Sequence, residues 1–308
     1  MQRRHRLLAL ASSLALTLGT NIVTVGAVAP TPSLSATAVS SIVSSMTPPE
    51  RSALAPAFAN PAIVPVAYSR SSYRFCKDAS GTVMMTLVGR EEASVATGSE
   101  WQSVPVSSGC NGPAAAPQGQ LSAIAPMSSG AGTYHDLTIT ISVNRDTRYA
   151  GYVWLLGGYF SWSNNFPYGA DWQNQNPDKF ATSWAGGLSL MSDGFSGKYY
   201  PSAGGTVSAL DISRQSVSAN AGVGYTFHEW STFGCVPQGG RCMANWGQTW
   251  QDIQESTYHG QIANVVVEYF HTTGGDVGYT FGFGPASITL TPSTGQPWQV
   301  AAYTSFTY

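Results

Sequence analysis

Carboxylates are the residues of this chain that could do chemistry, because the common catalytic motifs are missing. No serine stands in a Gly-x-Ser-x-Gly elbow, no His-Glu-x-x-His pair occurs, and the sequence has neither a phosphate-binding nor a dinucleotide-binding glycine motif. Glu229, Glu268 and Asp252 remain as weak catalytic candidates. Glycoside hydrolysis would need two such carboxylates facing each other at roughly 5–10 Å. A hydrolase is therefore one interpretation, and the missing motifs argue against it.

Both glutamates also have a structural interpretation. Two-residue alternation places Glu229 on the apolar face of its segment, where that face ends. It is then either buried, with a raised pKa, or solvated in the following loop, and we favour the solvated position. Glu268 lies in an apolar segment, where an ion pair with Arg214 or Arg241 would hold it without any catalytic role.

The spacing of the possible ligands does not predict a metal site. The cysteines form no Cys-x-x-Cys pair, and the histidines lie in separate segments that could converge only through the fold. Apart from His5, these histidines are His135, His228, His259 and His271. We therefore expect no metal and no cofactor.

The four cysteines are expected to form two local disulfides. Cys235 and Cys242 bracket a turn-rich loop that can bring their sulfurs together, and Cys76 and Cys110 bracket the first pair of strand candidates. Such bonds form in oxidising compartments outside the cytoplasm.

A loop rich in aromatic and amide residues is the main binding candidate. Its aromatic residue is Trp172, and its polar residues are Asn165, Asp171, Gln173, Asn174 and Asn176. Aromatic faces stack on sugar rings, and amides and carboxylates bond to hydroxyl groups. The pattern favours a carbohydrate ligand such as a cell-envelope glycan. The alternatives are a merely solvated loop, or calcium binding without the usual spacing of an acidic loop.

The elements that must position these residues are strands. Apolar and polar residues alternate through Leu137–Val143 and, in one register, from Ser216 to His228. Further strand candidates, separated by turn residues, are 82–88, 152–162, 182–191, 206–212, 262–271, 277–283, 287–291 and 299–306. The best helix candidate is a short one at 249–257. The sequence thus predicts an all-β domain, either an antiparallel β-sandwich or an open barrel of many strands.

The N-terminal residues predict secretion. A cationic head precedes an apolar run from Leu7 to Gly19, which indicates a signal peptide at 1–27 rather than a membrane span of ~20 residues. An uncleaved anchor is the alternative, and the export pathway stays open. Residues 28–67 are rich in Ala, Ser and Pro, which predicts a disordered leader. A pro-segment with a short helix near 36–46 is the other interpretation, and the β-rich domain is expected at 68–308.

Charge excludes one class of partner. Only 10% of the residues are charged, and loss of the signal peptide would move the net charge from −2 to about −5, so no basic surface is expected for nucleic acid. We expect a secreted binding protein for an extracellular glycan, with no permanent membrane span. A pore-forming protein is a further interpretation, since the alternation of 216–228 is typical of a membrane-inserting strand. Such a strand needs a matching partner, and 206–212 breaks register at Asp211.

Overall fold

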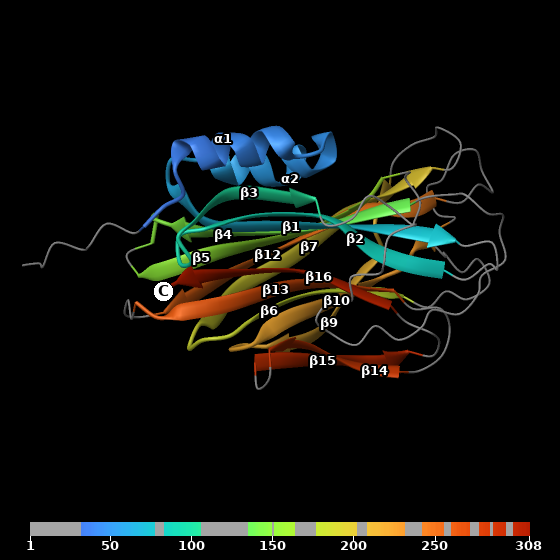
Figure 1. Cartoon of the computed structure of the whole chain (residues 1–308). Helices are drawn as coiled ribbons and strands as arrows, with labels where there is room; N and C mark the ends of the chain where they lie inside the picture. Colours follow the sequence, from blue (N-terminus) through green and yellow to red (C-terminus); the bar gives the residue numbers. More distant parts are fainter. Residues whose placement is uncertain are drawn as a thin grey trace, which may run out of the picture. The chain divides into compact units, whose positions relative to one another are not determined.

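The structure is almost entirely antiparallel strand, as the alternation predicts. The computed structural model describes residues 32–77, 83–105, 135–149, 151–163, 177–201, 208–231, 242–255, 260–271, 277–283, 286–293 and 298–308. Residues 32–308 belong to one compact unit, in which two short helices precede the first strand (Figure 1). The all-β fold class is confirmed.

The larger of the two main sheets has nine strands in the described residues, in the order β3-β2-β1-β4-β5-β12-β7-β8, with β11 paired to β12. Its strands are β1 Ile63–Lys77, β2 Val83–Ser94, β3 Ser99–Pro105, β4 His135–Asp146, β5 Tyr152–Trp162, β7 Ser189–Pro201, β8 Ser208–Ala209, β11 Trp230–Ser231 and β12 Cys242–Glu255. We call it the nine-stranded sheet.

The second main sheet has five strands in the described residues, in the order β16-β13-β6-β10-β9. Its strands are β6 Asp178–Trp184, β9 Ile212–Ser218, β10 Gly222–Phe227, β13 Ile262–His271 and β16 Trp298–Thr307. We call it the five-stranded sheet. All seven residues of β6 are buried, because β6 is a central strand covered on both faces.

The core lies between the inner faces of these two sheets. Phe160 of β5 contacts Phe180 of β6 and Tyr269 of β13, with ring centroids 5.0 and 4.9 Å away. Gly158 stands in the same inward row as Phe160, and a Cβ there would lie 3.0 Å from Val267. The missing side chain therefore lets β5 and β13 approach closely.

A hydrogen bond joins the two sheets at the edge of the core. The hydroxyl of Tyr73 in β1 donates to the carbonyl of Ala301 in β16 at 2.7 Å, across 228 residues of sequence. The amide of Ala301 donates back to the same hydroxyl at 3.3 Å. The phenol is thus paired as both donor and acceptor, as a buried hydroxyl requires.

The N-terminal segment is folded, so the prediction of disorder at 28–67 is wrong for the residues described there. Helices α1 Ala36–Ser45 and α2 Pro48–Ala59 precede β1, which itself begins at Ile63. The helix near 36–46 belonged to the alternative interpretation of this segment. Apolar residues of the two helices pack on the outer face of the nine-stranded sheet; the buried cluster includes Leu34, Ala38, Ile42, Met46, Leu54, Tyr68, Ala93 and Tyr159.

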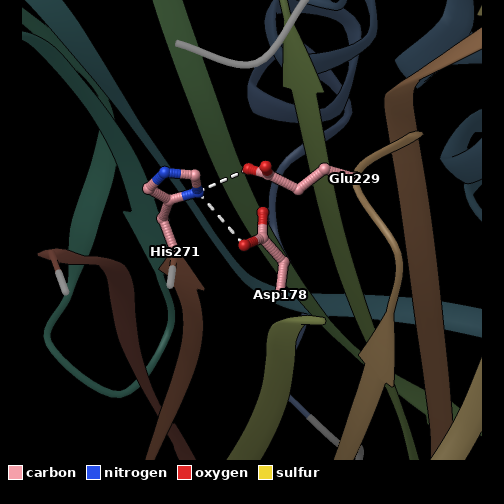
Figure 2. A group of neighbouring side chains, drawn as sticks. All are labelled: Asp178, Glu229 and His271. Atoms are coloured by element: carbon pink, nitrogen blue, oxygen red, sulfur yellow. Dashed lines mark hydrogen bonds and ion pairs between the residues drawn. The ribbon is translucent and has the colours of Figure 1, made fainter. Parts of the chain in front are cut away.

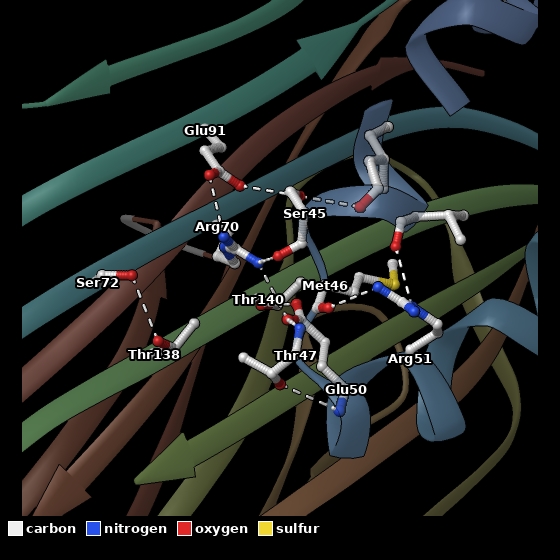
Figure 3. Close-up of polar contacts among 12 residues, drawn as sticks. Ser45, Met46, Thr47, Glu50, Arg51, Arg70, Ser72, Glu91, Thr138 and Thr140 are labelled. Carbon is white, nitrogen blue, oxygen red and sulfur yellow. Dashed lines mark hydrogen bonds and ion pairs between the residues drawn. The ribbon is translucent and has the colours of Figure 1, made fainter. Parts of the chain in front are cut away.

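A buried glutamate ties the helices to the sheet (Figure 3). The side chain of Glu50 is fully buried and accepts hydrogen bonds from the hydroxyls of Tyr68 at 3.2 Å and Thr140 at 2.7 Å. Its second oxygen pairs with the guanidinium of Arg70 at 3.2 Å. Arg70 also donates to the carbonyl of Ser45 at 2.7 Å and pairs with Glu91 at 3.0 Å.

Replacing this glutamate should be costly. In Glu50→Ala the guanidinium and two hydroxyls keep their buried positions but lose their acceptor, so we expect a loss of about 3–5 kcal/mol in the free energy of unfolding. Urea denaturation measures it. The matched control is Glu91→Gln, which removes the less buried partner of Arg70 and should cost about 1 kcal/mol or less. Equal costs for the two variants would contradict the role of Glu50.

The strands β14 Val277–Phe283 and β15 Ala286–Ser293 form a third layer. They pair with each other in a separate two-stranded sheet. This hairpin lies alongside β6, β9, β10 and β13, so it crosses a face of the five-stranded sheet rather than extending its edge (Figure 1). The inner face packs on the nine-stranded sheet, and the hairpin therefore covers the outer face.

Two predicted elements differ from the structure. The long strand expected at Ser216–His228 is a hairpin, in which β9 and β10 are joined by a turn at 219–221. The described part of the helix expected at 249–257, residues 249–255, belongs to β12, where β5 and β7 pair with it on either side. Long-range pairing with two neighbours outweighs a weak local helical pattern.

Among the residues that the structure describes, no helix has the length and apolar character needed to cross a membrane.

Candidate functional site

Three ionisable side chains meet at one end of the five-stranded sheet. Asp178 is the first residue of β6, Glu229 follows the end of β10, and His271 is the last residue of β13. Because β6 is antiparallel to both neighbours, its start lies beside their ends: Asp178 pairs with Phe227, and Lys179 pairs with Phe270. The sheet topology therefore assembles the group.

The three side chains converge on one imidazole nitrogen (Figure 2). Nδ1 of His271 lies 2.5 Å from Oε1 of Glu229 and 3.1 Å from Oδ1 of Asp178. The hydroxyl of Tyr269, two residues before His271 on the same face of β13, donates to the other oxygen of Asp178. Side-chain exposure is 0% for Asp178 and His271 and 3% for Glu229, so water does not screen these charges.

Burial and mutual charge shift the proton affinities of this group. Desolvation, helped by the nearby Asp178 charge, raises the pKa of Glu229 to about 8. Burial alone would lower the pKa of His271, but the carboxylates of Glu229 and Asp178 raise it to about 10. Burial and Asp178 also hold the pKa of Tyr269 well above its usual range. Near neutral pH both Glu229 and His271 are thus favoured in their protonated forms.

The ligand atoms of the group lie close enough to share one ion. One atom from each of Asp178, Glu229 and His271 falls within 4.8 Å of the others, and all three residues are buried. Two carboxylate oxygens and an imidazole nitrogen can hold a divalent cation or can share protons among themselves. The spacing of these residues in the sequence does not predict a metal site, because they come from three separate segments that only the fold brings together.

The three catalytic candidates from the sequence lie apart. Glu229 is buried in the group above, where the favoured prediction of a solvated side chain is wrong. Glu268 lies on the opposite face of the five-stranded sheet and accepts a hydrogen bond from Gln299 at 2.5 Å. Asp252 lies in β12 of the nine-stranded sheet and accepts one from Ser192 at 2.6 Å. The carboxylate that faces Glu229 is instead Asp178.

The ion pair proposed between Glu268 and Arg214 is also wrong. Arg214 pairs with Asp193, and the hydroxyl of Tyr225 donates to that same carboxylate at 2.5 Å. Arg241, the other proposed partner, lies outside the described residues.

Other predicted site residues cannot be placed. The binding loop with Asn165, Asp171, Trp172, Gln173, Asn174 and Asn176 lies outside the described residues. The same holds for Cys110 and Cys235 and for the side chain of Cys76, while Cys242 is buried. Glycan binding by this loop and the two disulfides therefore stay predictions.

The hairpin of β14 and β15 combines two different kinds of residue, in a pattern that bears on function independently of the buried group. Its register pairs Tyr279 with Leu290, Phe281 with Ile288, and Phe283 with Ala286. The alternate pairs are Thr280 with Thr289 and Gly282 with Ser287. Residues of one strand alternate between faces, so one row of the hairpin is apolar and the other contains only small uncharged residues.

Small residues form part of the surface that this hairpin covers. The outward row of β6 contains Lys179, Ala181 and Ser183, and that of β10 contains Gly222, Gly224 and Thr226, all of them buried. Small side chains bury little apolar area each. Apart from Lys179, the underlying strands β6 and β10 therefore offer the hairpin mostly small side chains, with few large apolar anchors.

No protein-family model and no curated protein matches the chain. A solved structure described as a pore forming protein is 7% identical, covers 56% of this chain and 87% of its own, and has a TM-score of 0.31. The Clostridium perfringens NetB toxin in its membrane-inserted form is 8% identical, with coverages of 79% and 97% and a TM-score of 0.22. At these TM-scores neither likeness carries an argument about this chain.

Proposed function

We propose that this protein acts outside the cell and permeabilises lipid bilayers by inserting the hairpin of β14 and β15. One observation carries the proposal: a separate two-stranded layer with an apolar row, a small polar row and no charge. From Val277 to Tyr308 the sequence contains no Asp, Glu, Lys or Arg, and Asp276 stands just before β14. The end of the hairpin that must cross the bilayer is thus uncharged.

Alternation of this kind suits a strand with lipid on one face and water on the other. The apolar row of Tyr279, Phe281 and Phe283 would face lipid, and the row of Thr280 and Gly282 would face water. A lone hairpin in lipid leaves the backbone groups of both outer edges without partners. Hairpins from several copies must therefore pair edge to edge, which makes a pore the expected product.

The length of the hairpin sets a condition on the membrane. Its strands contain 7 and 8 residues, whereas a membrane-crossing strand usually needs about 9–11. A short span is accommodated by a thin bilayer at the lowest cost. We expect vesicles of short-chain phosphatidylcholine to leak faster than vesicles of long-chain phosphatidylcholine.

The same substitution on the two rows tests the proposal. Wild-type protein should release dye from short-chain phosphatidylcholine vesicles. Phe281→Asp places a charge in the lipid-facing row, at a cost per inserted strand below the about 2–4 kcal/mol that an arginine or lysine incurs at the bilayer midplane. Because every copy in a pore repeats this cost, the variant should abolish release. Thr280→Asp, one residue away, places that charge in the water-facing row and should keep release while favouring cations over anions.

Two results would overturn the proposal. One is the absence of dye release by wild-type protein at high protein-to-lipid ratio in vesicles of either thickness. The other is equal release by the two aspartate variants, both checked to melt cooperatively. Equal release would mean that insertion does not depend on whether the charge stands in the lipid-facing or the water-facing row.

A further inference from the structure

The side-chain group at the end of the five-stranded sheet carries an inference that does not depend on membrane insertion. Its members come from three separate segments, yet their ligand atoms lie within 4.8 Å of one another in a buried position. We propose that Asp178, Glu229 and His271 form a binding site for a divalent transition-metal ion, with Zn²⁺ as the reference ion.

Hydrogen-bond geometry gives the first argument. Nδ1 of His271 carries at most one hydrogen, and its hydrogen bond goes to Oδ1 of Asp178 at 3.1 Å. Oε1 of Glu229 lies 2.5 Å from the same nitrogen, and its side chain is only 3% exposed. Two buried carboxylate oxygens therefore compete for the single hydrogen of one nitrogen, and a cation between the three groups would satisfy both.

The kinds of ligand give the second argument. Two carboxylates supply the two negative charges that neutralise a divalent cation, and an imidazole supplies a nitrogen. Calcium and magnesium prefer all-oxygen sites, whereas zinc and its neighbours in the transition series accept mixed nitrogen and oxygen ligands at about 2.0–2.2 Å. The ligand set therefore selects the transition-metal class.

The surroundings of the group give the third argument. Metal-binding carboxylates are usually held in place by a second hydrogen bond. The hydroxyl of Tyr269 donates to the oxygen of Asp178 that does not face the imidazole. This contact orients Asp178 with its other oxygen toward Nδ1. Three protein ligands leave at least one position of a four-coordinate ion for a further group or water.

The test uses tag-free full-length protein that has been stripped with a chelator and dialysed against Zn²⁺. We expect one equivalent of bound zinc per chain by elemental analysis, and a rise in melting temperature with added Zn²⁺. Co²⁺ should give visible absorption bands that Zn²⁺ abolishes by displacement.

Matched variants locate the ion. Glu229→Gln keeps the size and polarity of the side chain but removes one negative charge, and it should weaken Zn²⁺ binding by at least tenfold. His228→Gln changes the neighbouring residue, a histidine outside the group, and should bind like wild type. Less than one-fifth of an equivalent of zinc on wild-type protein, or equal affinity in both variants, would overturn the proposal.

Discussion

A chain that begins at Ala62, without α1 and α2, is expected not to fold stably. The segment that contains the two helices buries Leu34, Ile42, Met46 and Leu54, and full burial of each such side chain stabilises a protein by about 1.5–3 kcal/mol. The ordering entropy of the helices offsets part of this sum. What remains is comparable with the whole stability of a typical domain, about 5–15 kcal/mol.

Thermal unfolding and solubility measure this effect. We expect either aggregation or a melting temperature lower by at least about 10 °C, since each kcal/mol shifts the midpoint by roughly 2–4 °C at this size. The matched control begins at Pro32 and should melt like the longer chain. If the chain from Ala62 melted within about 3 °C of that control, the helices would be a dispensable addition to the sandwich.

The second large effect is expected from pH. In metal-free protein the folded pKa of Glu229 is raised to about 8 and that of His271 to about 10. Both groups then bind more protons in the folded state than in the unfolded state, Glu229 between about pH 4.5 and 8 and His271 between about pH 6.5 and 10. Stability should therefore fall as the pH rises through these windows, most steeply between about pH 6.5 and 8.

Each proton held this way can change the free energy of unfolding by up to about 1.4 kcal/mol per pH unit. The ionisable side chains of Asp178 and Tyr269 also face this pair. We expect a higher melting temperature at pH 6 than at pH 9, measured with a chelator present. Glu229→Gln should flatten this dependence and His228→Gln should not. The same slope in both variants would show that protons at Glu229 do not affect stability.

The prediction of disorder at 28–67 followed the overall composition of the segment and overlooked a helix-capping motif within it. Thr47 caps α2, its hydroxyl accepts from the amide of Glu50, and the Glu50 carboxylate accepts from the amide of Thr47. This Thr-Pro-Pro-Glu capping box, with proline in the first turn, is readable in the sequence. The abundance of Ala, Ser and Pro suggested disorder. The prediction failed because the apolar sheet surface that the helices cover is formed by residues later in the chain, which the composition of this segment does not reveal.

The turn between β9 and β10 illustrates a limit of alternation itself. Ser218 pairs with Gly222 across a three-residue turn, and Val217 pairs with Val223. Odd residues therefore lie opposite odd residues, and one alternating pattern continues unbroken through the reversal until the irregularity at Gly224. Strand and hairpin have the same sequence pattern here, and only the choice of neighbours separates them.

The buried group could be anticipated only in part. His271 continues the inward row of Val265, Val267 and Tyr269, and Asp178 continues that of Phe180. A polar residue at the end of an apolar row is visible in the sequence. That these rows end at the same place depends on β6 lying between β10 and β13, which no local pattern encodes.

The hydrogen bonds between Tyr73 and Ala301 have a consequence for the timing of assembly. In a chain that crosses a membrane N-terminus first, β1 emerges long before β16, and 228 residues must follow Tyr73 before its partner arrives. Contacts so distant in sequence form slowly, because a long loop must close before they stabilise anything. In export of an unfolded chain, the sandwich would therefore close around its core only after β16 has crossed the membrane. The proposed hairpin would then act on bilayers only outside the cell that makes it.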